Sequence, residues 1–159
     1  MRSCGILMPV FSLPSKYGIG TFGKEAKRFI DFLKQAGQSY WQILPLNPTN
    51  YGDSPYQSFS SFAGNPYFID IEQLIEEKLL TEREADSFDF GSDSESVDYG
   101  KLYENRLKLL RLAFKNFVPT RDYEQFCEEN TYWLDDFALF MALKNANKDI
   151  PWYDWDKSL

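Results

Sequence analysis

Two short apolar segments separated by one amphipathic helix occupy the first 46 residues, and this order restricts the fold more than any other feature of the chain. Residues 5–11 and 40–46 are mostly apolar with little polar alternation, which is typical of strands covered on both faces. Apolar residues at three- and four-residue steps in 24–36, followed by Gly37, predict a helix between them. A strand, a crossover helix and a second strand predict two parallel strands, and therefore an α/β fold.

A polar and aromatic loop follows the second apolar segment. Residues 51–70 read YGDSPYQSFSSFAGNPYFID, which mixes aromatic rings with hydroxyl and amide groups. Sugars present a flat C–H face that a ring can cover and a rim of hydroxyls that short polar side chains can bond. Loops at the ends of strands commonly carry function. The segment 47–67 is therefore a candidate carbohydrate-binding loop.

The rest of the chain has helical periodicity. Asp70 with Gln73, and Thr81 with Glu84, resemble capping boxes at two helix starts. Further helices are expected at 99–117, 123–129 and 131–145. In the first of these, the inward stripe is predicted to be Leu102, Tyr103, Arg106, Leu107, Leu110, Ala113, Phe114 and Phe117. We expect two parts: 1–70, which holds the strands and the loop, and 71–159, a mostly helical subdomain.

Composition excludes several classes of protein. The 159 residues carry a net charge of −7, so a nucleic-acid partner is not expected. No apolar run approaches the roughly 20 residues of a membrane helix, so no membrane partner is expected either. The chain has no histidine, and its two cysteines, Cys4 and Cys127, have no metal-ligand spacing. We expect no metal or cofactor, free thiols, and a cytoplasmic protein whose N-terminus is its first strand.

The segment Gly18-Ile19-Gly20-Thr21-Phe22-Gly23 matches the G-x-G-x-x-G dinucleotide fingerprint. A dinucleotide site also needs an acidic residue at the end of the next strand to hold the ribose. That strand ends in LPLNP, which has no carboxylate. The glycines are therefore interpreted as residues that allow a tight turn and close packing.

Two acidic clusters have alternative interpretations. Asp135 and Asp136 could be a catalytic couple, but adjacent helical residues do not face each other, so a solvated face is favoured. In the tail, Asp154 and Asp156 alternate with Trp152, Tyr153 and Trp155. This cluster could be a platform for a sugar, although packing against another part of a longer chain is favoured.

The string GDSPYQSFSSFAGNPY, preceded by YWQILPLNPT and by LPSKYGIGTFG, closely resembles the amylomaltases, which are 4-α-glucanotransferases of the α-amylase superfamily. The resemblance extends from about residue 4 to at least residue 103 and is strongest before residue 70. It implies a (β/α)8 TIM barrel with helical insertions and an active site at the carboxyl ends of the strands. It also implies retaining transfer between α-1,4-glucans or maltooligosaccharides, with a carboxylate nucleophile and a carboxylic acid that protonates the leaving oxygen.

The resemblance also implies roles for individual residues. Tyr56 matches a tyrosine that stacks on the sugar beside the scissile bond, and Ser54 and Asp53 match its polar neighbours. Tyr51 and Tyr103 match a pair in a second glucan-binding groove. Alternatively, Tyr56 could be a core tyrosine, since Pro55 fixes its backbone. Phe59 and Phe62 are expected to pack under the loop, Asn65 to form a turn, and Tyr99, like Tyr103, to lie near a ligand.

Members of the family are much longer than this chain, which resembles their N-terminal part: the first two barrel strands and most of a helical insertion. Their catalytic carboxylates lie on later strands, so no catalytic residue is named here. We expect this piece to be inactive alone and to need the missing C-terminal part of the barrel as its partner. The alternatives are a non-catalytic glucan-binding module and a structural or interaction domain.

Overall fold

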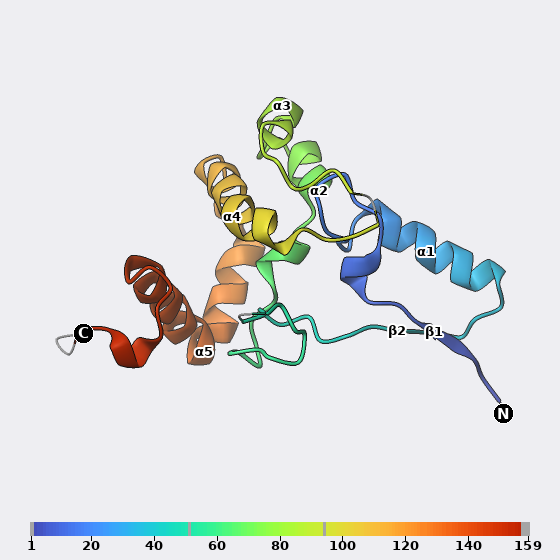
Figure 1. The fold of residues 1–159 in the computed structure, drawn as a ribbon, viewed down its shortest axis with the longest axis horizontal. Helices are drawn as coiled ribbons and strands as arrows, with labels where there is room; N and C mark the ends of the chain where they lie inside the picture. Colours follow the sequence, from blue (N-terminus) through green and yellow to red (C-terminus); the bar gives the residue numbers. More distant parts are fainter. Residues whose placement is uncertain (1, 51, 94, 157–159) are drawn as a thin grey trace. The chain divides into compact units, whose positions relative to one another are not determined.

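The computed structural model describes residues 2–50, 52–93 and 95–156. Its only sheet in these ranges has two parallel strands, β1 (Gly5–Leu7) and β2 (Tyr40–Gln42), with Gly5 opposite Tyr40. Helix α1 (Lys24–Gln35) connects them (Figure 1). The predicted strand, helix and strand are confirmed, and both strands send their loops from the same edge of the sheet.

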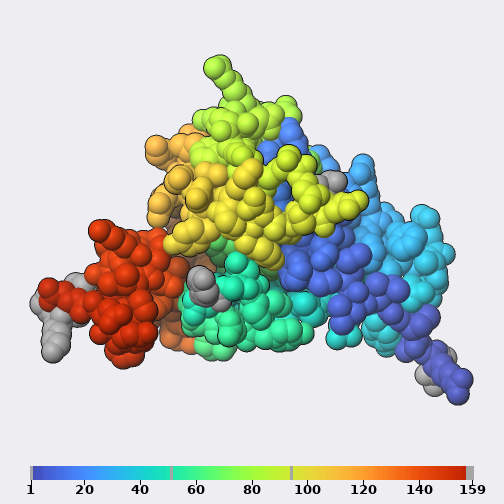
Figure 2. Space-filling view, in the orientation of Figure 1, coloured from blue at the N-terminus to red at the C-terminus, as the bar shows by residue number. Residues whose placement is uncertain are grey.

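The predicted burial and length of the strands are wrong for this chain. All three residues of β1 are exposed, and Tyr40 in β2 is 65% exposed. The chain leaves the first strand at Pro9, which lacks a ladder N–H, and forms the 3-10 turn η1 (Val10–Ser12). Apolar strands are covered by neighbouring strands and helices, and the described residues supply little of that cover. Figure 2 shows the N-terminal strand projecting from its unit.

One side of the sheet does pack against α1. The Phe29 ring meets the Trp41 ring edge-on with centroids 5.1 Å apart. The Trp41 indole Nε1 donates a 2.7 Å hydrogen bond to the Met8 carbonyl, and the Met8 amide donates to the Gln42 carbonyl at 3.0 Å. These contacts fix the start of the loop that follows β1.

Six helical elements follow the loop after β2 in the described residues. They are η2 (Pro66–Phe68), α2 (Ile71–Glu76), α3 (Glu82–Asp86), α4 (Tyr99–Lys115), α5 (Arg121–Ala146) and η3 (Trp152–Asp154). The capping box of Thr81 and Glu84 is confirmed in both directions. Asp70 caps α2 by accepting from the Gln73 amide at 2.7 Å. The Gln73 side chain donates to Glu77 instead of returning to the cap, so only half of that predicted box forms.

The chain divides into two compact units, one of residues 1–59 and 64–117 and one of residues 60–63 and 118–159. The first unit has a core formed by residues from the loop after β1, α2, α3, the 88–90 segment and α4. Its buried members are Tyr17, Ile19, Ile71, Leu80, Ala85, Phe90, Leu102, Leu109 and Ala113. The division at residue 70 between a barrel part and a helical insertion concerns a larger fold and stays a prediction.

The inward stripe of α4 differs from the predicted one. Leu102, Arg106, Leu109 and Ala113 are buried, at steps of four, three and four residues. Phe114 was expected to face inward but is 68% exposed, whereas Tyr103, which was expected to reach toward a ligand from the first turn of the helix, is 62% exposed. Each follows a buried residue and lies about 100° further around the helix. The error arose because a wide apolar face has more than one stripe compatible with helical spacing.

In the second unit, α5 is one continuous helix, so the prediction of two helices with a break near residue 130 is wrong. Asn130 donates to the Phe126 carbonyl at 2.8 Å, and Thr131 donates to the Glu128 carbonyl at 3.3 Å. These side chains bond to the preceding turn of the helix, so they do not interrupt it. Within this unit the Phe62 ring stacks on Trp133, and Trp155 packs on Phe140.

A pair of substitutions on α4 tests which stripe is buried. Leu109→Ala should lower the free energy of unfolding by about 2–5 kcal/mol, because Leu109 is 0% exposed and the substitution leaves a cavity. The matched control Phe114→Ala removes a larger but exposed side chain and should lower it by less than about 1 kcal/mol. Urea unfolding followed by circular dichroism measures both. A larger loss for Phe114→Ala would contradict the observed stripe.

Candidate functional site

The first part of the loop after β2 folds back on itself. Thr49 and Ser58 form an isolated antiparallel bridge, and the Asn50 amide donates to the Gln57 carbonyl at 3.1 Å. Inside this bridge, the Asp53 amide donates to the Asn50 carbonyl at 3.0 Å. Asp53 has φ +54°, a conformation that aspartate tolerates better than most residues. The segment between residues 49 and 58 is therefore a defined turn.

Tyr56 lies on this turn with 73% of its surface exposed, which argues against its being a core tyrosine. Its backbone amide donates to the Ser54 hydroxyl at 3.4 Å, so the structure brings these two candidate residues together. An exposed ring on a hydrogen-bonded turn has a face available to a ligand.

Asp53, the third candidate on the turn, is half-buried. Burial raises the pKa of its carboxyl group, while a 3.4 Å hydrogen bond from the Thr49 hydroxyl acts in the opposite direction. The Asp53 charge in turn raises the pKa of the Tyr99 phenol, although burial is the larger cause. Tyr99 at the start of α4 therefore lies within electrostatic range of the turn, and its expected place beside a ligand stays a prediction.

The proposed second groove is only partly described. Tyr103 lies one helical turn after Tyr99 and is 62% exposed. Tyr51 lies outside the described residues. Exposure of Tyr103 is compatible with a ligand contact, and the pairing of these two tyrosines stays a prediction.

The second half of the loop is anchored by Asn65. Its backbone amide donates to the Leu46 carbonyl at 2.8 Å, and its side-chain Oδ1 accepts from the Tyr67 amide at 2.9 Å. Asn65 thus caps η2 and joins the two ends of the loop, which confirms its expected role as a turn former. Phe62 packs, as expected of it, but on Tyr132 and Trp133 of α5.

The glycine fingerprint is explained by close packing. Gly18 has φ +84°, and a Cβ there would meet Phe90 at 2.6 Å. A Cβ on Gly23 would overlap the carboxyl group of Asp70. The geometry supports the packing interpretation. The close neighbours are Phe90 of the first unit's core and the Asp70 cap of α2.

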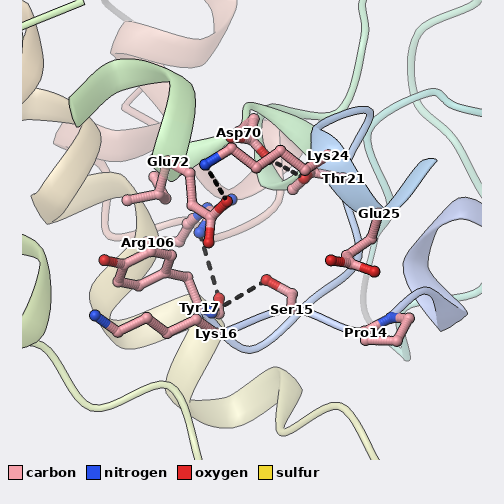
Figure 3. A pocket seen from close by; sticks show the side chains of 11 residues that line it. Pro14, Ser15, Lys16, Tyr17, Thr21, Lys24, Glu25, Asp70, Glu72 and Arg106 are labelled. Carbon is pink, nitrogen blue, oxygen red and sulfur yellow. Dashed lines mark hydrogen bonds and ion pairs between the residues drawn. The ribbon is translucent and has the colours of Figure 1, made fainter. Parts of the chain in front are cut away.

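A pocket of about 240 Å³ lies in the first unit beside this glycine segment (Figure 3). Its lining combines hydroxyl groups with charges of both signs, from Ser15, Lys16, Tyr17, Thr21, Lys24, Glu25, Asp70, Glu72 and Arg106. The Lys24 ammonium pairs with Glu72 at 3.4 Å and with Glu76 at 3.0 Å. The Thr21 hydroxyl donates to Asp70 Oδ2. Asp53, Ser54 and Tyr56 do not line this pocket.

A second pocket of about 310 Å³ lies between the loop after β1 and the segment before α4. Apolar Phe11, Ile19 and Val97 and the hydroxyl groups of Ser12, Ser15, Ser96 and Tyr99 line it, together with Asp93 and Glu95. Tyr99 therefore lines this pocket, and its phenol also interacts electrostatically with Asp53 on the turn.

Sequence reasoning missed one residue of the site's support. Arg106 was placed on the inward stripe without a partner, yet its guanidinium donates to the Tyr67 and Ile69 carbonyls at 2.8 and 2.6 Å. No signal in a single sequence distinguishes this arginine from one that reaches solvent past an apolar stripe.

The acidic candidates outside the loop have no catalytic arrangement. Asp135 and Asp136 are both exposed on α5, as expected of a solvated face. Trp152 and Tyr153 pack on each other and are 67% and 70% exposed, so both interpretations of the tail stay open. Among the described residues, no group of three or more His, Cys, Asp or Glu could hold a metal ion. None of the described helices combines the length and apolarity needed to cross a membrane.

Comparison with known proteins gives a consistent result. Residues 8–159 match the protein family described as 4-alpha-glucanotransferase. A 4-alpha-glucanotransferase from Clostridium butyricum is 51% identical over 96% of this chain and 32% of its own length. One from Thermus thermophilus is 47% identical over 97% of this chain and 31% of its own. An amylomaltase from Streptococcus agalactiae, solved in complex with acarbose, has a TM-score of 0.91 and 43% identity over 99% of this chain and 32% of its own. The chain thus spans about a third of these relatives.

The opposite environments of two aspartates give a pH test. Burial should hold the pKa of Asp53 above its ordinary 3.8, whereas the Ser96 hydroxyl and the Glu95 amide should hold that of Asp93 below 3.8. Carboxyl NMR titration measures both, and Thr49→Val should raise the Asp53 pKa further. Because the folded state binds the Asp53 proton more tightly than the unfolded chain, ionisation of Asp53 should reduce stability as the pH rises above 3.8. An Asp53 that titrates below Asp93 would contradict this geometry.

Proposed function

The chain belongs to the 4-alpha-glucanotransferase family, and we propose that it forms part of an enzyme that transfers α-1,4-glucan segments between maltooligosaccharides with retention. The observation that carries this proposal is the match of the whole chain, and not of the loop alone, in both sequence and structure. The proposal also assigns the two strands to the first part of a (β/α)8 barrel, with residues 71–159 as a helical insertion.

The location of the loops supports this assignment. The chain turns away from both parallel strands at their carboxyl ends, and (β/α)8 enzymes build their active sites from such loops. The loop after β2 carries Asp53, Ser54 and Tyr56 on one hydrogen-bonded turn. The nucleophile and the acid that protonates the leaving group would come from the remaining polypeptide, and this chain would supply sugar-binding contacts.

Tyr56 has the chemistry for stacking on a glucose ring. Its exposed ring offers a flat π face, and the positive charge of an oxocarbenium-like transition state would be stabilised by that face. Ser54 and Asp53 would bond the sugar hydroxyls at its edge. Tyr103, with Tyr51, would contact a glucan chain further from the reacting bond.

The remaining polypeptide would cover apolar surface that this chain leaves open. In the first unit, Leu7 and Tyr40 on the two strands are 56% and 65% exposed. In the second unit, α5 has no fully buried side chain among the described residues, and Leu139 is 60% exposed. Large apolar side chains exposed on strands and on a long helix are typical of surface that another part of the chain covers, and the longer relatives contain polypeptide that could do so. We also propose a cytoplasmic location, because Cys4 and Cys127 are free thiols.

Complementation tests the proposal. This chain should show no glucan transfer alone, because the catalytic carboxylates would lie elsewhere. Mixed or co-expressed with the remaining two thirds of a relative, such as the Clostridium butyricum 4-alpha-glucanotransferase, it should restore conversion of maltotriose to glucose and longer oligosaccharides. A stable complex without transfer, or transfer by this chain alone, would count against the proposal.

Tyr56 should matter in the complete enzyme. Tyr56→Ala should remove about 1–3 kcal/mol of stacking. The value of kcat/KM for maltooligosaccharide transfer should therefore fall roughly 5- to 150-fold. Tyr56→Phe keeps the ring and should retain most of the activity. An unchanged kcat/KM in Tyr56→Ala would remove Tyr56 from the site.

A further inference from the structure

Arg106 is a fully buried arginine whose hydrogen-bond partners are backbone carbonyls. It extends from α4 into the core of the first unit and is 0% exposed. Its Nη2 donates to the Tyr67 carbonyl at 2.8 Å and to the Ile69 carbonyl at 2.6 Å. Its Nη1 donates to the Tyr17 carbonyl at 3.4 Å, which is the one of the three bonds drawn in Figure 3. The guanidinium carbon also lies 5.7 Å from the centre of the Phe90 ring.

The three carbonyls belong to two different segments. Tyr17 lies in the loop that follows β1, whereas Tyr67 lies in η2 and Ile69 directly after it, at the far end of the segment that connects β2 to α2. The two segments are separated in sequence by α1 and β2. The Arg106 side chain therefore connects two parts of the chain that are distant in sequence. Asp70 reinforces the junction, because it caps α2 and also accepts from the Thr21 hydroxyl of the first loop.

The junction extends to the base of the loop that carries Tyr56. Tyr67 donates its amide to the Asn65 side chain, and Asn65 donates its own amide to the Leu46 carbonyl at 2.8 Å. Leu46 and Asn65 are the two ends of the loop. Holding the Tyr67 carbonyl therefore also holds the base of the loop.

Arg106 is poorly suited to the two other roles of a buried arginine. It is poorly placed to bind a dissolved anion: although it lines the pocket in Figure 3, its exposed fraction is 0% and both Nη atoms donate to backbone carbonyls. As a purely stabilising residue it is an unfavourable choice: burial lowers its pKa to about 10 although the nearby Asp70 charge acts in the opposite direction, and Nε has no hydrogen-bond partner among the described residues. What an arginine provides that an apolar residue does not is a rigid fork of donors at fixed spacing.

We propose that Arg106 is a positioning residue: its guanidinium locks the loop after β1 to the end of the loop after β2, and so sets the position of Tyr56 for glucan binding. The locking of the loops stands on the geometry alone, and the effect on glucan binding rests on the proposed function.

Hydrogen exchange in the full-length enzyme tests the locking. Arg106→Met removes every donor while keeping an unbranched buried side chain, and Arg111→Met on the same helix is the control because Arg111 is exposed. In Arg106→Met the amides of Gly20, Asn65 and Phe68 should exchange at least about tenfold faster than in the control, with those of α1 unchanged. In Arg106→Lys the exchange rates of these amides should lie between those of Arg106→Met and those of the control. Equal rates in both Met variants, or equal acceleration in α1, would overturn the proposal.

A double-mutant cycle tests the effect on Tyr56. Arg106→Met should weaken maltooligosaccharide binding by about tenfold in the enzyme that retains Tyr56, but by less than about twofold in the Tyr56→Ala background. Independent, multiplicative losses would show that Arg106 does not act through Tyr56 and would overturn that step. If the unaltered enzyme binds no maltooligosaccharide, the proposed function fails, and hydrogen exchange still decides whether Arg106 locks the loops.

Discussion

The first unit depends on one charged group that is bonded to uncharged partners. The Arg106 guanidinium donates to three backbone carbonyls from inside the core. A hydrogen bond from a charged donor contributes about 1.5–3 kcal/mol, whereas burying the charge costs several kcal/mol. Because these opposing effects are of similar size, the net gain in stability is small. The main consequence is geometric: two loops and one helix share a single fixed point.

This fixed point joins two segments that follow the two parallel strands. Two parallel strands with a helical crossover send both following loops to one edge of the sheet. Val10, Leu13 and Ala26 form the buried cluster against which Trp41 and Leu46 pack. The turn with Asp53, Ser54 and Tyr56 is therefore held at its base while the Tyr56 ring stays exposed. A rigid base with an exposed aromatic ring is the arrangement that sugar stacking requires.

Sequence reasoning succeeded where the signal is local. The helix from Lys24 depends on its own periodicity, and the Thr81 cap on two residues three positions apart, so both were predicted. The loop could be singled out because its composition departs sharply from that of its neighbours. Its candidate residues Asp53, Ser54 and Tyr56 do lie on one turn, and Tyr51 lies outside the described residues.

Sequence reasoning failed where the answer depends on distant residues. The strands were predicted to be buried because they are apolar. The residues that would cover them are not among those that the structure describes. Periodicity could not choose between Leu109 and Phe114, which lie on neighbouring stripes of one broad apolar face. It also read Asn130 and Thr131 as a break, because it could not show that both side chains bond back to the helix. The partners of Arg106 are 37 to 89 residues away in sequence.

The central claim is that the loops after β1 and β2 form one preorganised surface that grips α-linked glucose through Tyr56. The most direct measurement is a crystal structure of the full-length polypeptide with a bound maltooligosaccharide. The account predicts a glucose ring stacked on Tyr56, with Ser54 or Asp53 in hydrogen-bond range of its hydroxyls and Arg106 still bonded to Tyr67 and Ile69. Sugar bound elsewhere in the molecule, with the Tyr56 turn bare, would contradict it.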